Sequence, residues 1–319
     1  MDGPQRPPEG TLARFVEDVW WPTVKASTST RTHQSYKSIY DNHFGEVDRM
    51  PIKEIRLPIL QAWIDSKSKY IARIGRKGKE TEVVKTRSPK TVRTIYGVMT
   101  SMLNLASKTG DYPYRDHELV GLPDLDPADV AVPDVRQCRA VLAAVAGTWA
   151  EGPAWGATML GMRRGEALGA KRSHVELLDN RAVVTLQDTL HEHGEEHKLK
   201  SKKKGVVRRL VLPREWGEKL LSFSPPTSIY LFTGEDGGPF KPSKITKEIP
   251  RACAAAGLPH FTFHSLRHAC ATNLMDAGVP EAKINEVLGH TTIRMTREYL
   301  AHHDDAMLDA FLRLGDKMA

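Results

Sequence analysis

The sequence predicts a mainly α-helical protein with a small β-sheet, divided into two domains. Apolar residues recur about every 3.6 positions across residues 11–110, which indicates amphipathic helices. Residues 111–132 are rich in Pro and Asp and lack this period, so we expect a linker with few contacts of its own. Short segments of alternating apolar and polar residues between 174 and 212 indicate strands of a small sheet.

The N-terminal part is predicted to be an all-helical domain that follows a disordered stretch at residues 1–10. Its expected helices cover residues 11–26, 30–44, 58–74 and 89–108. Ser88 and Pro89 suit the N-cap and first position of the last helix, and Gly110 suits its end. We expect residues 74–86 to be a loop.

Basic residues are concentrated between the last two of these helices. Residues 67–93 hold ten Lys or Arg and two Glu. The simplest interpretation of this charge is a solvated loop. Lys90, Thr91 and Arg93, however, project near a helix start, where backbone N–H groups favour phosphate, so we predict that these three bind DNA.

The C-terminal part is predicted to be a mixed domain over residues 133–303, followed by an amphipathic helix at 304–319. Its expected elements are helices at 133–145, 149–160 and 241–256 and strands at 174–178, 181–187 and 206–212. Ser243 and Lys244 lie near the start of one helix and are candidate DNA contacts. The final helix would either pack on its own domain or be exchanged with another protomer.

Composition is typical of a globular protein without membrane-spanning or disulfide-rich segments. The chain has 319 residues, enough for two domains, and its 46 Lys and Arg against 39 Asp and Glu give a net charge of +7. Three cysteines form no CxxC pair, which fits a reducing compartment. The sequence has no apolar signal segment and no run of about eighteen apolar residues. We therefore expect a cytoplasmic protein without a membrane partner.

Four residues near the C-terminus suggest chemistry on a phosphodiester. His264 and Arg267 are three positions apart, so they share a helix face, and His290 and Tyr299 follow across two predicted turns. Guanidinium groups bind phosphate oxygens, imidazoles move protons near neutral pH, and a phenol can attack phosphorus when cations stabilise its anion. No carboxylate cage for Mg²⁺ is present, so we expect no metal and no other cofactor.

The order and spacing of these residues resemble the tyrosine recombinases, the phage integrase family. HSLRH at 264–268 is followed by LGH at 288–290 and by a tyrosine nine positions after His290. GMRRGE at 161–166 resembles the family's Gly-x-Arg-x-Gly-Glu motif. This resemblance implies that Arg163 binds the scissile phosphate, that Glu166 supports the catalytic set, and that Arg164 lies outside the site.

The same resemblance implies a role for the lysine-rich segment between two strands. LKSK at 199–202 is similar to the family's hairpin motif, which assigns Lys200 as the acid that protonates the leaving oxygen, with Lys202 as the alternative. Lys202 and Lys203 are expected DNA contacts. His191, His193 and His197 form a candidate metal cluster, but an exposed loop near DNA is the favoured interpretation.

The resemblance also implies an architecture and a function. It implies a helical, SAM-like core-binding domain at 11–110 and an α/β catalytic domain, which together form a C-shaped clamp on double-stranded DNA attachment sites. Tyr299 would form a 3′-phosphotyrosyl intermediate within a homotetramer, with directionality or DNA-bending factors as further partners. The expected role is integration or excision of a phage or mobile element. The alternatives are a type IB topoisomerase and a DNA-binding regulator without catalytic activity.

Overall fold

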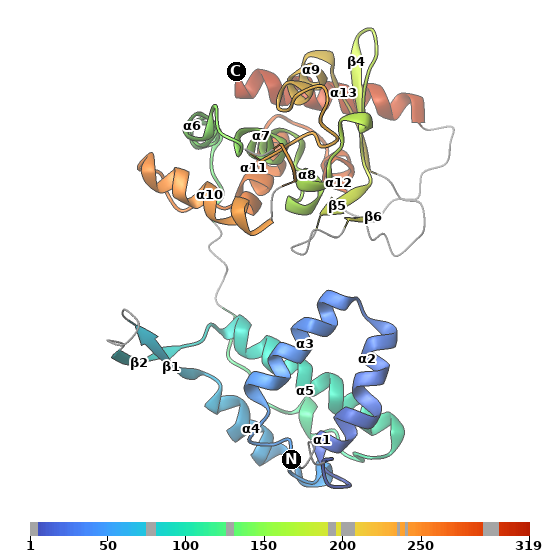
Figure 1. The fold of residues 1–319 in the computed structure, drawn as a ribbon, viewed down its shortest axis with the longest axis vertical. Helices are drawn as coiled ribbons and strands as arrows, with labels where there is room; N and C mark the ends of the chain where they lie inside the picture. Colours follow the sequence, from blue (N-terminus) through green and yellow to red (C-terminus); the bar gives the residue numbers. More distant parts are fainter. Residues whose placement is uncertain are drawn as a thin grey trace. The chain divides into compact units, whose positions relative to one another are not determined.

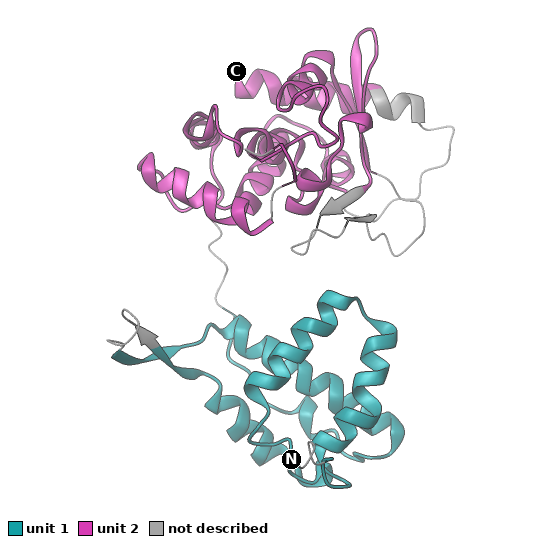
Figure 2. Cartoon of the chain, viewed as in Figure 1, with its two compact units in different colours: residues 1–128 teal, residues 129–319 magenta. Residues whose placement is uncertain are grey.

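A computed structural model describes residues 6–74, 81–125, 131–190, 196–198, 208–234, 237–239, 242–289 and 300–319. The chain divides into two compact units, residues 1–128 and 129–319 (Figure 2). Each unit has its own hydrophobic core. The predicted mainly α-helical fold class with a small amount of sheet is confirmed (Figure 1).

The first unit is built from helices around one apolar core. They are α1 (Leu12–Phe15), a π-helical turn (Val16–Trp20), α2 (Trp21–Ser27), α3 (Thr30–His43), a short 3-10 helix (Ile52–Glu54), α4 (Leu57–Ser66) and α5 (Pro89–Thr109). The caps of α5 are those predicted: the Ser88 hydroxyl accepts from the Thr91 N–H, and Gly110 ends the helix with φ of 86°. One face of this helix is buried through Val92, Met99 and Leu103.

Residues 69–74 and 81–86 pair as two strands of a β-hairpin, so the predicted all-helical domain is wrong there, as are the end of the predicted helix over 58–74 and the part of the predicted loop over 74–86 that the structure describes. Helix α4 ends at Ser66, and β1 (Lys69–Ile74) pairs antiparallel with β2 (Thr81–Thr86). Tyr70 and Ile71, which fall within the predicted helix over 58–74, lie on β1 and are exposed. The β-branched residues of β2 favour a strand, and this preference decides the structure where no core dictates it.

The segment after α5 is part of the first unit rather than a linker with few contacts. Tyr112 is fully buried and donates its hydroxyl proton to the Ile55 carbonyl at 2.8 Å. A 3-10 helix follows at Asp116–Glu118, where the Asp116 carboxylate accepts from the Arg56 side chain and from the Leu57 N–H. Aromatic and ionic contacts therefore hold this segment on the helices.

Residues 6–10 also contact the first unit, contrary to the expected disorder of residues 1–10. Arg6 forms an ion pair with Asp18 at 2.8 Å, and the Gly10 carbonyl accepts from the Ile52 N–H at 2.9 Å. These contacts fix the chain before the first helix.

The second unit contains a three-stranded antiparallel sheet with strand order β3-β4-β7. These strands are β3 (Val175–Leu177), β4 (Arg181–Leu186) and β7 (Arg208–Pro213), and a short pair, β5 (Asp188–Leu190) and β6 (Glu196–Lys198), continues from them. In register, Val184 of β4 lies opposite Leu210 of β7. The predicted strands are confirmed within one or two residues.

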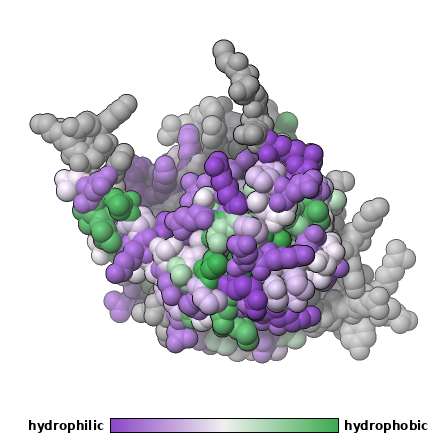
Figure 3. Space-filling view, turned by 90° about the horizontal axis from the view of Figure 1, so that it is seen from below, coloured by the Kyte–Doolittle hydropathy of each residue, from purple (hydrophilic) through white to green (hydrophobic). Residues whose placement is uncertain are grey.

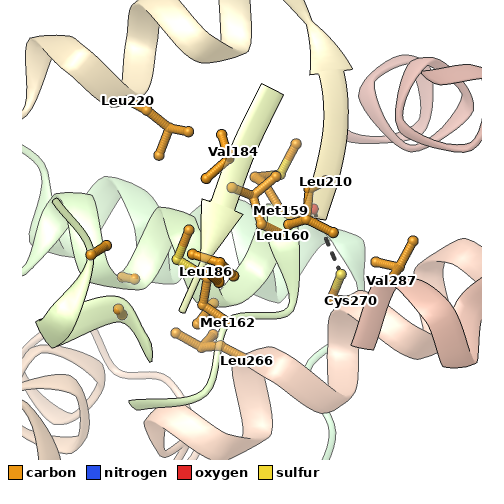
Figure 4. Packing of buried hydrophobic residues seen from close by; sticks show 14 of the residues in the cluster. Met159, Leu160, Met162, Val184, Leu186, Leu210, Leu220, Leu266, Cys270 and Val287 are labelled. Carbon is orange, nitrogen blue, oxygen red and sulfur yellow. Dashed lines mark hydrogen bonds between the residues drawn. The ribbon is translucent and has the colours of Figure 1, made fainter. Parts of the chain in front are cut away.

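Helices cover this sheet and enclose the core of the second unit. They are α6 (Val135–Val145), α7 (Glu151–Leu160), α8 (Arg164–Gly169), α9 (Arg214–Ser222), α10 (Pro242–Ala255), α11 (Phe263–Asp276), α12 (Glu281–Leu288) and α13 (Leu300–Met318), with a 3-10 turn at Arg172–His174. Helix α7 packs along α11, while α9 lies against β4. Figure 4 shows Leu186 and Leu210 of the sheet together with Leu160 of α7 and Leu266 of α11 in one apolar core.

The C-terminal helix packs on its own unit. Met307, Phe311 and Leu314 of α13 are buried in the core of the second unit, and the helix contacts β7 and α11. In the single chain, α13 thus packs within its own unit, and exchange between protomers stays a prediction. The helix also begins at Leu300 rather than at residue 304, because nothing in the sequence from 300 to 306 breaks it.

Candidate active site

The GMRRGE segment forms the turn from α7 into α8. Arg163 is the N-cap residue of α8, in extended conformation with φ of −70° and ψ of 152°. Its backbone N–H donates to Glu166 Oε2 at 2.8 Å, and its Nη1 donates to Glu166 Oε1 at 2.6 Å. One buried carboxylate therefore fixes both the main chain and the side chain of Arg163.

A second arginine, which sequence reasoning missed, reaches Glu166 from the sheet. Arg208 at the start of β7 donates from Nη1 to Glu166 Oε2 at 2.6 Å, and from Nη2 to the Leu160 carbonyl at the end of α7. Strand alternation places Arg208 on the same face as Leu210 and Leu212, which was the signal for its burial. A buried arginine needs a carboxylate partner, and Glu166 supplies it.

A third arginine, Arg267 of α11, lies beside the same carboxylate. Its Nη1 is 3.9 Å from Glu166 Oε2 and donates to the Gly161 carbonyl, while its Nη2 donates to the Leu288 carbonyl at 2.7 Å. Arg267 thereby binds the C-terminal ends of α7 and α12, whose last carbonyls lack partners within their helices. The structure brings Arg163, Glu166 and Arg267 together, and their catalytic roles stay predictions.

Two glycines make this convergence of helix ends sterically feasible. Gly161 and Gly289 end α7 and α12 in the left-handed conformation, with φ of 57° and 66°. A Cβ on Gly161 would lie 2.5 Å from Leu288 Cδ2, and one on Gly289 would lie 3.0 Å from Arg208 Cδ. Larger residues at these positions would separate the helix ends that carry the site.

The arginine cluster is electrostatically unbalanced toward positive charge. Burial alone raises the pKa of the Glu166 carboxyl, but the charge of Arg208 and the N–H and charge of Arg163 outweigh it and lower this pKa. Burial, reinforced by the charges of Arg208 and Arg163, lowers the pKa of Arg267 to about 10, so it stays protonated at neutral pH. The side chain of Arg163 is 41% exposed, so it can reach an anion from solvent.

His264 lies one turn before Arg267 on α11 and is exposed. Partial burial of this otherwise exposed imidazole, followed by the charges of His268, Arg267 and Arg163, lowers its pKa. Its ring centroid is 4.3 Å from that of His268. His264 is therefore neutral at pH 7 and suited to accept a proton beside the arginines.

Several expected site residues lie outside the described residues: His290, Tyr299, Lys200, Lys202 and Lys203. The same holds for His191 and His193 of the candidate metal cluster and for the side chain of His197. Arg163 Nη2 donates to the carbonyl of Gly289 at 3.1 Å, which ties the residue that precedes His290 to the cluster. The roles of these residues remain predictions.

The expected DNA-binding residues divide between the two units. Lys244 is exposed and Ser243 is half-buried in the first turn of α10, and Arg164 of α8 donates to Thr246 one turn further along at 2.6 Å. In the first unit, Lys90 and Thr91 are exposed at the start of α5. Arg93 donates to the Pro123 carbonyl at 2.8 Å, so at least part of its role is to hold the segment after α5.

Comparison with known proteins agrees with this geometry. Residues 157–306, which contain the whole arginine cluster, match the phage integrase family. This part of the chain, just under half of its length, is similar to the phage integrase family of tyrosine recombinases. It is 35% identical over 81 residues to tyrosine recombinase XerC from Corynebacterium efficiens, covering 25% of this chain and 26% of the relative.

Other relatives of the family extend the similarity in sequence and in fold. The chain is 29% identical over 166 residues to a XerC-like recombinase from Caldanaerobacter subterraneus, covering 44% of this chain and 42% of that protein. It thus spans less than half the length of these two relatives. The Tn1549 transposon integrase bound to circular intermediate DNA has the same fold, with a TM-score of 0.70, 14% identity and coverage of 93% and 99% of the two chains.

A lambda integrase dimer on a core site has the same fold as well, with a TM-score of 0.65, 14% identity and coverage of 90% and 99% of the two chains. At this identity the two solved integrases establish the fold alone.

Among the described residues, no helix is long and apolar enough to cross a lipid bilayer.

Proposed function

We propose that this chain cuts and rejoins double-stranded DNA at specific sites through a 3′-phosphotyrosyl intermediate. The observation that supports this most directly is the cluster of Arg163, Arg208 and Arg267 around Glu166. Three guanidinium groups and one carboxylate leave a net charge of +2 on these side chains. The guanidinium of Arg163 is exposed to solvent, and the imidazole of His264 lies one turn before Arg267 on α11. Such a site stabilises the extra negative charge of a phosphodiester under attack.

In the proposed reaction, the Tyr299 hydroxyl oxygen attacks the scissile phosphorus, and the bond between phosphorus and the 5′ oxygen breaks. Arg163 and Arg267 hold the nonbridging oxygens, and His264 accepts the tyrosine proton. Lys200, with Lys202 as the alternative, protonates the leaving 5′ oxygen, and His290 donates to the phosphate. Because the phosphotyrosyl ester conserves the energy of the broken bond, rejoining needs no nucleotide cofactor.

The biological role we propose is recombination between defined DNA sites by an oligomer bound to DNA. The curated relatives bear the name XerC, and the solved relatives are integrases on DNA, one of them a lambda integrase tetramer on a Holliday junction. Integration or excision of a phage or mobile element is the role favoured by the GMRRGE and LKSK motifs. The XerC relatives point instead to recombination on the host chromosome.

The test is covalent capture on a nicked suicide substrate, which traps the protein because the short cleaved strand diffuses away. Candidate attachment sites would be taken from DNA adjoining the coding sequence, and the adduct would be read on a denaturing gel. Wild type should form it and Tyr299→Phe should not, while both bind the DNA. Absence of an adduct for wild type on DNA that it binds would overturn the catalytic proposal.

A further inference from the structure

The described residues of the β1–β2 hairpin contribute no side chain to the hydrophobic core of the first unit. It has six residue pairs, from Lys69 opposite Thr86 to Ile74 opposite Thr81, and it projects away from the helices of its unit (Figure 1). Every residue of β2 is exposed. An isolated two-stranded ribbon is only marginally stable in water, so a ribbon of this length is expected to gain contacts from a partner.

The root of the hairpin is fixed to the unit. Arg87 Nη1 donates to the carbonyls of Lys67 and Lys69, both at 2.9 Å, and its guanidinium lies 4.7 Å from the ring centroid of Tyr70. Lys67 is itself buried and pairs with Glu46 at 3.0 Å. The hairpin is therefore presented in a defined direction from its own unit.

Apolar side chains lie exposed along the hairpin. Ile71 is 64% and Val84 is 67% exposed, and they are paired across the two strands on one face. Val83, on the other face, is 40% exposed. Figure 3 shows hydrophobic residues exposed at the left edge of the view, with hydrophilic residues beside them. Exposed apolar surface with a polar rim marks an interaction site.

Charge identifies the partner. Lys69 and Lys85 lie near the root of the two strands, Lys90 is exposed at the start of α5 just beyond them, and Glu82 is the only acidic residue in the described part of the hairpin. Duplex DNA carries about one negative charge per 1.7 Å of its axis. A second copy of this chain carries a net charge of +7, so overall it repels the lysines of the hairpin, whereas DNA attracts them.

We propose that the β1–β2 hairpin is a DNA-binding ribbon that lies in the major groove. This inference rests on the proposed function only in taking duplex DNA as the partner. The groove is about 12 Å wide and admits a two-stranded ribbon. Lys69 and Lys85 bind phosphates beside the groove, and apolar side chains such as Val83 contact base edges, where the thymine methyl group is the complementary partner.

The test compares DNA affinity of charge-matched variants by fluorescence anisotropy. The probe is a labelled mixed-sequence duplex of about 30 base pairs, titrated across a range of salt concentrations. The Lys69→Gln, Lys85→Gln double variant removes the hairpin lysines. The control, Lys25→Gln with Lys53→Gln, removes two exposed lysines of the same unit and gives the same change in net charge. Circular dichroism verifies that both remain folded.

The hairpin variant should bind roughly tenfold more weakly near 0.1 M salt, and its log–log salt slope should be shallower by about 2, since each phosphate contact contributes about 0.9. The control should bind within about twofold of wild type. Equal losses in the two variants would overturn the proposal. A wild-type chain that binds DNA but forms no covalent adduct would overturn the catalytic function and leave this inference intact.

A second variant separates DNA from a protein partner. Ile71→Ser with Val84→Ser keeps every charge but removes the apolar pair. Retained assembly of this variant on DNA, measured by sedimentation, supports the proposal. If this variant loses assembly while the lysine variant binds DNA like wild type, the hairpin contacts a second copy and the proposal is wrong.

Discussion

Arg208 and Glu166 form an ion pair that is buried from solvent. Arg208 Nη1 lies 2.6 Å from Glu166 Oε2, and the two side chains are 5% and 0% exposed. The same carboxylate binds the exposed Arg163 and lies beside Arg267. A strand residue outside the family motifs thus completes the support of the site.

Removal of Arg208 should strongly destabilise the protein. Arg208→Met should lower the free energy of unfolding by about 3–5 kcal/mol, because it leaves the Glu166 charge buried without its main partner. Urea denaturation measures this. Lys37→Met, which breaks the exposed pair of Lys37 and Asp41, is the control and should cost less than about 1 kcal/mol. Similar losses for both would mean that burial does not set the strength of the Arg208 pair.

Gly161 should be intolerant of a side chain for steric reasons. Gly161→Ala combines a left-handed backbone with a contact of 2.5 Å to Leu288, whereas Gly110→Ala has a left-handed backbone and no atom within 4 Å. We expect the second to cost about 1 kcal/mol and the first clearly more. Denaturation of the two variants separates the conformational cost from the clash, and equal costs would exclude a role for the clash.

The pH dependence of cleavage should report on His264. Its lowered pKa keeps the imidazole neutral at pH 7, so the acid limb of the rate should lie below the ordinary histidine value of 6.5. His268→Gln removes one of the causes, so the pKa of His264 should rise and the limb should move to higher pH. Burial, the larger cause, remains. Single-turnover rates across pH measure the acid limb of the wild type and of His268→Gln. If the limb lies at the same pH in both, a group other than His264 controls it.

The cis packing of α13 predicts unequal effects of two neighbouring truncations. Phe311→Ala should cost about 3–5 kcal/mol, because Phe311 is fully buried in the core of its own unit. Leu312→Ala, 47% exposed, should change stability by about 0.5 kcal/mol or less. Unfolding measured at two protein concentrations should give the same values. A strong dependence on concentration would instead indicate that the helix is exchanged between chains.

Local signals in the sequence predicted most helices of the structure. The Ser88 cap, the Pro89 start and the Gly110 end specify α5 without reference to the rest of the fold. The spacing of His264 and Arg267 and the GMRRGE motif likewise located the core of the site. These features depend on hydrogen bonds and backbone conformations within a few residues, which a sequence displays directly.

Features that depend on distant partners were not predictable in the same way. In VVRRLVL, strand alternation places Arg208 on the face of Leu210 and Leu212, but only the tertiary structure shows that its partner is Glu166. Among the described residues of the hairpin, 69–72 and 81–86 include no buried side chain, so its apolar residues do not alternate as in an ordinary strand. Tyr112 and Asp116 look like linker residues until Ile55 and Arg56 are known to lie beside them.

The guanidinium groups around Glu166 outnumber its carboxylate, so they repel one another in the free protein. Three cations share one carboxylate, and folding holds them together although each would be better separated in water. A bound phosphate reduces this repulsion, so binding of DNA stabilises the folded state. Oxyanions in a buffer, such as sulfate, should therefore raise the melting temperature of the free protein and also compete with its substrate.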